Sequence, residues 1–102
     1  MTTHKAVKSF PLGQIVATKG VLASVPNSHM LECLARHTRG DWGNVCKEDA
    51  ASNNRALVEG SRLLSAYAID PTKPTKGYGE NCLWIITECD RSVTTFLLPE
   101  EY

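Results

Sequence analysis

The sequence contains no apolar run long enough to cross a membrane. Its uninterrupted apolar stretches extend over only a few residues, whereas a membrane-spanning helix needs about 20. Residues 1–11 also lack the apolar block of a secretory signal. With 102 residues, of which 42% are hydrophobic, the chain can bury one core without a disulfide or a metal ion. We therefore expect a single cytoplasmic domain over residues 1–102 that does not associate with membranes.

Signals for disulfides, metals and cofactors are also absent. The four cysteines are Cys33, Cys46, Cys82 and Cys89. No pair has the C-x-x-C spacing of a zinc site, and in one strand Cys82 and Cys89 would lie about 23 Å apart, beyond the roughly 7 Å that a disulfide allows. His29 and His37 lie about 12 Å apart along a helix and cannot share a metal ion. We expect four reduced, mostly buried thiols, no metal and no cofactor.

The chain also lacks an excess of charge of one sign. It has 11 basic and 11 acidic residues, which argues against a nucleic-acid binder held by bulk electrostatics. Residues 1–39 nevertheless carry five basic residues and one acidic residue, a balance of +4, and the remainder carries six and ten, a balance of −4. This segregation could orient an acidic partner toward the first half or let two copies form a homodimer, although solvated faces explain it equally well.

The last twenty residues, 83–102, indicate a β-hairpin. Two β-branched apolar runs flank a short polar break at Asp90 and Arg91. The expected strands of an antiparallel meander are residues 62–69, 83–89 and 93–98, with a further short strand at 13–18. A continuation of the preceding helix through the first of these runs is the alternative.

Helical spacing and capping residues predict three helices. Their expected ranges are residues 19–25, 27–39 and 47–59. The fold class is therefore α+β, a three- to four-stranded antiparallel sheet with a C-terminal meander and about three helices packed on one face. Residues 1–8 are expected to form a loose lead-in, and residues 70–81, with two prolines and two glycines, a long hairpin loop.

The core should include large apolar residues from both layers. We expect Leu31, Leu34, Ile85 and Phe96 to be among the most buried residues. Both faces of the 83–89 strand are apolar, which suggests that helices cover one face and that something else, such as a partner subunit, shields part of the other.

The densest polar stretch is residues 36–43. It offers the imidazole of His37, two guanidiniums including that of Arg39, the carboxylate of Asp41 and the indole of Trp42, which together form the inventory of a binding site. The same residues also suit a helix end, where cations and a glycine are favourable and an indole can close the turn.

A second polar group surrounds the tight turn of the hairpin. Glu88, Asp90 and Arg91 lie there, and Asp90 is a turn former, so its neighbours can be explained as cross-strand polar pairs. If the turn folds toward the end of the second helix, Glu88 and Arg91 would instead join His37 and Asp41 in one cleft.

Several sequence blocks resemble a family of short uncharacterised bacterial proteins found on plasmids and other mobile elements. The blocks are ARHTRGDWG, NNRAL, EGSRLLSAY, WIITE and DRSVTTFLLPEEY, in that order within residues 12–102. The resemblance implies a genomic neighbourhood and carries over no catalytic residue. The loop at residues 70–81 looks longer here than the usual connection in that family.

Two function classes follow from these observations. The first is a small non-enzymatic binding or modulator protein, encoded on a mobile genetic element, that acts on a host macromolecule, a protein rather than a nucleic acid. The alternative is an RNase-like toxin in which His37, Arg39 and Arg91 converge on an open cleft and act on RNA. This alternative rests on fold-level analogy. No serine-hydrolase elbow or glycine-rich phosphate loop is present to suggest another enzyme class.

Overall fold

The computed structural model describes residues 10–102, and the expected lead-in at residues 1–8 lies outside this range. The elements follow in the order β1 (Gln14–Ala17), α1 (Lys19–Ser24), α2 (Asn27–Thr38), α3 (Lys47–Glu59), β2 (Leu63–Tyr67), β3 (Leu83–Thr87), β4 (Val93–Leu97) and a 3-10 helix, η1 (Pro99–Glu101). All these helices and strands except η1 were predicted, with ends within two residues of those observed. The alternative in which the third helix continues is wrong, because Gly60 takes a left-handed conformation (φ 81°) and ends α3.

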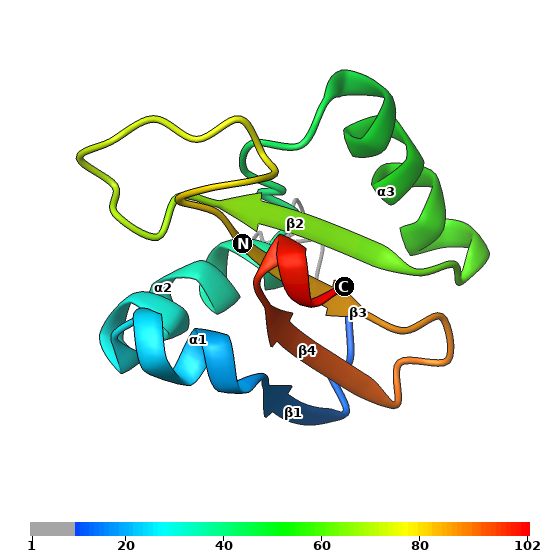
Figure 1. The fold of residues 1–102 in the computed structure, drawn as a ribbon. Helices are drawn as coiled ribbons and strands as arrows, with labels where there is room; N and C mark the ends of the chain where they lie inside the picture. The colour runs from blue at the N-terminus through cyan, green and yellow to red at the C-terminus, as the bar shows by residue number, and fades with distance from the viewer. Residues whose placement is uncertain (1–9) are drawn as a thin grey trace, which may run out of the picture.

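The four strands form one sheet in the order β1-β4-β3-β2 (Figure 1). The meander from β2 to β4 is antiparallel, as predicted. The sheet is mixed, because β1 pairs with β4 in a parallel register. Parallel strands need a long crossover connection, and here the crossover contains all three α-helices before the chain returns through the meander.

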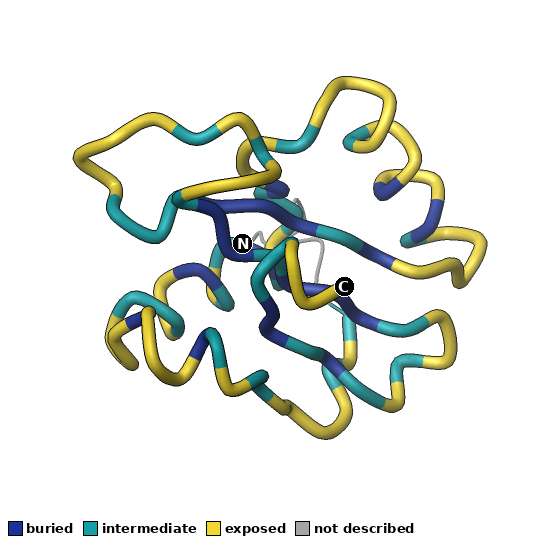
Figure 2. Tube along the Cα trace, in the orientation of Figure 1, coloured by how far each residue is buried: buried dark blue, intermediate teal, exposed yellow. Residues whose placement is uncertain are grey.

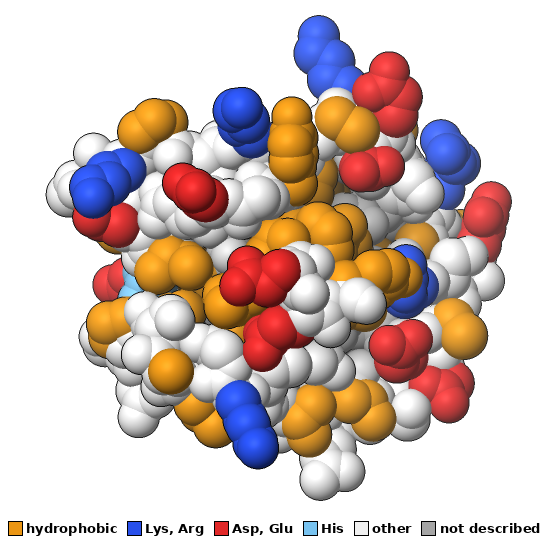
Figure 3. Space-filling view, in the orientation of Figure 1, with side chains coloured by type: hydrophobic (Ala, Val, Ile, Leu, Met, Phe, Trp, Pro, Cys, Tyr) orange, Lys and Arg blue, Asp and Glu red, His pale blue; other side chains and the backbone are white. Residues whose placement is uncertain are grey.

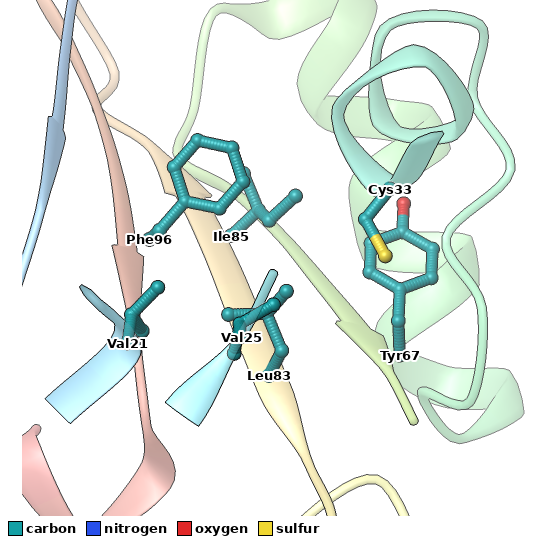
Figure 4. Packing of buried hydrophobic residues seen from close by; sticks show 7 residues of the cluster. All are labelled: Val21, Val25, Cys33, Tyr67, Leu83, Ile85 and Phe96. Atoms are coloured by element: carbon teal, nitrogen blue, oxygen red, sulfur yellow. The ribbon is translucent and has the colours of Figure 1, made fainter. Parts of the chain in front are cut away.

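The helices cover one face of the sheet. Register places Leu83, Ile85 and Phe96 on that face, where they pack with Val21 and Val25, the latter directly after α1 (Figure 4). Cys33 and Tyr67 complete this cluster on the side of α2. In Figure 1, α1 and α2 lie toward one end of the sheet and α3 toward the other.

A second, smaller cluster lies under α3. It consists of Trp42, Ala56 and Leu63, with Phe10 and Leu57 packed beside it. Burial is greatest along β2, β3 and β4 and decreases toward β1, the outer sides of the helices and the loop at residues 70–81 (Figure 2).

The opposite face of the sheet is shielded by the chain itself. Ala66, Ile86 and Leu97 are buried there, and the Trp84 ring contacts the Tyr102 ring at 5.7 Å between centroids. Trp84 Nε1 also donates to the Gly77 carbonyl in the long loop at 2.8 Å. In Figure 3, hydrophobic side chains gather around the acidic groups over η1 at the centre of the view. The C-terminal residue Tyr102 and the long loop thus supply cover that was expected on this face, where a partner subunit was one suggestion.

Two of the four expected core residues are correct. Ile85 and Phe96 are buried, Leu34 is only partly buried, and Leu31 is 67% exposed, so its prediction was wrong. α2 is rotated so that its two buried residues, Cys33 and His37, point inward. Leu31 precedes Cys33 by two positions, about 200° around the helix, and so faces outward.

The four cysteines are free thiols, with Cys33 and Cys82 buried and Cys46 and Cys89 exposed. None of the helices within residues 10–102 is both long and apolar enough to cross a membrane.

Replacing Ile85 by alanine should lower the free energy of unfolding by about 2–5 kcal/mol, because a fully buried side chain leaves a cavity. The control, Val58→Ala, removes a side chain that is 89% exposed and should change stability by no more than about 0.5 kcal/mol. Urea unfolding measures both values. Equal effects of the two substitutions would show that the core is assigned incorrectly.

Candidate functional site

His37 lies in the last turn of α2 and is fully buried against the sheet. Its Nδ1 lies 2.5 Å from the Ser65 hydroxyl, and its Nε2 lies 2.9 Å from the Thr87 hydroxyl. Thr87 contacts the Thr94 hydroxyl at 2.8 Å, and Thr94 donates to the Leu12 carbonyl at 2.7 Å. These contacts form a chain of buried polar groups, the His37 chain, which crosses β2, β3 and β4.

The carbonyl at the end of the His37 chain fixes the direction of the hydrogen bonds between His37 Nε2 and Leu12. A carbonyl oxygen only accepts, so the single hydroxyl proton of Thr94 goes to Leu12. Thr87 then donates to Thr94, because Thr94 has no second proton to give. Since that proton is used, Thr87 accepts from the N–H at Nε2 of His37, and in a neutral imidazole Nδ1 then accepts from the Ser65 hydroxyl. The network thereby assigns the Nε2–H tautomer to a neutral imidazole.

The environment also keeps His37 neutral. Burial, and to a smaller extent the positive charge of Arg91, lower the pKa of His37 from 6.5 to about 4. The imidazole therefore carries no charge at neutral pH and has no contact with solvent, so it cannot exchange protons with a bound substrate at the surface.

Asp41 and Trp42 close the turn after α2. Arg36 donates to both carboxylate oxygens of Asp41, at 2.7 and 3.1 Å, and this hydrogen bonding lowers the pKa of Asp41. The same carboxylate accepts from the Gly43 amide at 3.3 Å. Trp42 is 5% exposed, and its Nε1 donates to the Asn54 side chain at 3.0 Å. The turn is therefore held by local contacts and by the packing of the indole.

Phe10 connects the two predicted polar segments. Its ring lies 5.3 Å from the His37 ring and 6.4 Å from the Trp42 ring, centroid to centroid. The guanidinium carbon of Arg91 lies over the same ring at 5.8 Å. The 36–43 and 88–94 segments thus approach each other through the interior, with an aromatic ring between them, and do not form the open cleft considered from the sequence.

Arg91 joins the hairpin turn to the end of α3. It takes a positive φ of 61° and donates to the carbonyls of Ser61 (2.6 Å), Glu88 (3.1 Å) and Ala56 (3.1 Å). A cation at a helix C-terminus is favourable because the last carbonyls carry partial negative charge. Asp90 stabilises the turn by accepting from the amide and the hydroxyl of Ser92, and Glu88 is partly buried.

Arg39 remains apart from these contacts. It is exposed, and its side chain forms no hydrogen bond or ion pair with another residue of the described range. His37, Arg39 and Arg91 therefore do not converge on one accessible surface.

An open groove lies where α3 meets the hairpin turn. It has a volume of about 550 Å³, and we call it the α3 groove. Its walls include Phe10, Asn54, Leu57, Val58, Glu59 and Arg91. Val58 is 89% exposed, so the groove presents apolar side chains beside a guanidinium.

Sequence analysis identified His37 and Arg91 as candidate site residues but did not identify the residues that contact them. Ser65, Thr87 and Thr94 are common strand residues, and only the strand register shows that all three hydroxyls share the helix-covered face. Phe10 was missed because it follows a stretch without periodicity. A hydroxyl at alternate positions of otherwise apolar strands is the one signal that could have indicated an inward polar partner.

Comparison of the chain with protein-family models, with curated proteins and with solved structures finds no match. Within residues 10–102, no group of three His, Cys, Asp or Glu side chains is placed to hold a metal ion. The geometry of the described residues alone therefore carries the functional argument.

The lowered pKa of His37 makes stability depend on pH in a defined window. The unfolded imidazole binds a proton near pH 6.5 and the folded one only near pH 4, so protonation favours unfolding as the pH falls between these values. We expect the free energy of unfolding to drop by roughly 3 kcal/mol from pH 6.5 to pH 4.

Urea unfolding at several pH values measures this drop, and His37→Gln should remove most of it. His29→Gln takes an imidazole from the same helix while leaving the His37 chain intact, and should keep the drop. Carboxyl groups such as Asp41, whose pKa is lowered, take up protons in the folded protein only below this pH window. An unchanged slope in His37→Gln would contradict the assignment.

Proposed function

We propose that this chain is a small non-enzymatic binding protein, encoded on a mobile genetic element, that binds a partner protein through the α3 groove. The observation that carries the proposal is that His37 and Asp41 form their hydrogen bonds within the protein while the α3 groove is open. His37 is buried, and both of its ring nitrogens are hydrogen-bonded within the His37 chain. Asp41 is paired with Arg36. The mobile-element origin rests on the resemblance of the sequence blocks.

The chemistry of the α3 groove suits a protein segment. Leu57 and Val58 offer apolar contact, and Asn54 and Phe10 lie beside them. Interfaces place apolar and aromatic side chains together with arginine at their centre. The groove has this composition.

Arg91 adds a preference for an acidic group. Its guanidinium is bonded to carbonyl oxygens, and within residues 10–102 no carboxylate forms an ion pair with it. A carboxylate from the partner would supply the opposite charge, and such charge complementarity favours specificity and encounter. The expected partner segment therefore carries a large apolar side chain next to Asp or Glu.

Nucleic acid fits the groove less well. Phosphate backbones are bound by several lysines and arginines in a row, whereas this groove has one arginine and also contains Glu59. The overall charge of the chain is zero. These features favour a protein partner.

The RNase-like alternative lacks an accessible general acid or base. It requires His37 with Arg39 and Arg91 at an open surface, yet His37 is 0% exposed and its pKa is about 4. We therefore favour binding over catalysis. Incubation of the purified protein with RNA tests the alternative directly, and His37-dependent cleavage would overturn the binding proposal.

Binding through the α3 groove can be tested by affinity capture from bacterial lysate. Val58→Gln removes exposed apolar contact, and Asn54→Asp adds a negative charge beside Arg91 while keeping an oxygen for the Trp42 Nε1. Both should reduce capture of a specific protein at least about tenfold, as loss of a central contact does. Leu22→Gln, on α1 and 64% exposed, is the control and should retain full capture. Equal capture by all variants would rule out the groove.

A further inference from the structure

The two edges of the sheet differ. At β2 the residues after α2 pair with the strand, because Ala66 donates to the Trp42 carbonyl at 3.1 Å and Asn44 donates to the Ala66 carbonyl at 2.7 Å. Gly43 forms a bridge with the same residue. At the other edge, no segment of residues 10–102 pairs with the outer side of β1. This edge is therefore open within the described chain.

The backbone groups at the open edge can be identified from the ladder. Gln14 donates to the Ser92 carbonyl and Thr18 donates to the Phe96 carbonyl, so alternate residues of this strand face β4. Ile15 and Ala17 consequently direct their N–H and C=O groups away from the sheet. These are the groups that another strand would bond.

β1 also lacks most of the features that keep an open edge from pairing. Exposed edge strands are usually protected by short length, charged residues, proline or a bulge; β1 has only four residues, but Gln14–Ala17 contains neither charge nor proline. Ile15 is 48% and Val16 is 38% exposed. An apolar edge of this kind is suited to pairing.

An apolar groove continues from this edge along α2. It has a volume of about 310 Å³ and is lined by Ile15, Met30, Leu31, Leu34 and Phe96, with Asn27 at its margin. Leu31 is 67% exposed. Apolar side chains of α2 therefore lie in an open groove beside the outer edge of β1.

We propose that a second copy of this chain occupies the open edge, with the two β1 strands antiparallel about a two-fold axis at Val16. Ile15 then pairs with Ala17 of the second copy, and Ala17 with its Ile15, so all outward groups of β1 are bonded. The left-handed conformation of Gly13 (φ 65°) ends the extended segment and disfavours a longer register. Such an interface is self-complementary, as two-fold symmetry requires.

The pairing also covers the apolar groove. The two sheets become continuous, and because a rotation about an axis normal to the sheet keeps the same face upward, both α2 helices lie on one side. Each then brings its Leu31 toward the other helix. The uncharged strand and the zero net charge of the chain leave little repulsion against this association.

This inference is independent of the α3 groove. α3 contacts β2, at the edge opposite β1, so a dimer carries one α3 groove at each outer end. Two sites on one assembly would increase avidity for a partner with two matching segments.

Light scattering coupled to size-exclusion chromatography tests the association. The wild-type protein should have twice the mass of one chain, and Leu31→Lys, which places a charge in the covered groove, should have the mass of one chain. Val58→Lys is the matched control on α3 and should remain dimeric. A wild-type protein of single-chain mass at every concentration would overturn the proposal.

A cross-link tests the register. At a two-fold axis through Val16 the two Cα atoms form a non-hydrogen-bonded pair about 4.5 Å apart, within the range of about 4.4–6.8 Å that a disulfide spans. In a Cys46→Ser, Cys89→Ser background, which removes the exposed thiols, Val16→Cys should form a reducible dimer under mild oxidation and Val58→Cys should not. Equal cross-linking of the two variants, or none through Val16→Cys, would overturn the proposed pairing.

Discussion

The requirement that the buried imidazole of His37 be fully hydrogen-bonded constrains the rest of this structure. An unpartnered polar group in an apolar interior costs several kcal/mol, and His37 has two ring nitrogens to satisfy. Ser65 and Thr87 satisfy them from neighbouring strands. The Thr94 hydroxyl donates the last hydrogen bond of the chain to the Leu12 carbonyl, just before β1. Helix α2, three strands and the entry to the fourth are therefore held in one relative position.

The same constraint explains the dense polar stretch at the end of α2. Once His37 is held against the sheet, the next residues must turn sharply toward β2, and the Arg36–Asp41 pair fixes that turn. Tyr67 donates to the Asp41 carbonyl at 2.7 Å, which ties the turn to the strand. The stretch has the composition of a binding site because a turn between a buried helix end and a sheet edge needs the same polar groups.

The limits of prediction from this sequence have specific physical causes. The hairpin was predictable because Ile85 and Phe96 lie in alternating runs that depend only on neighbours along the chain. Leu31 was misplaced because the rotation of α2 depends on the burial of His37, a contact with distant strands. The parallel pairing of β1 and the hydroxyl partners of His37 are non-local in the same way, since they follow from register. The polar residues were found, but the direction in which each one points was not.

The two edges of the sheet differ because the segments that follow α2 and β1 take different paths. The residues that end α2 close the β2 edge, and Trp42 there packs against Phe10. No comparable segment of residues 10–102 follows β1, because the chain turns directly into α1 at Thr18, whose side chain accepts from the Val21 amide. The local capping that starts α1 thus takes the chain away from the edge it could have covered. Within residues 10–102, the chain therefore covers the β2 edge of the sheet and leaves the outward backbone groups of β1 without a paired strand.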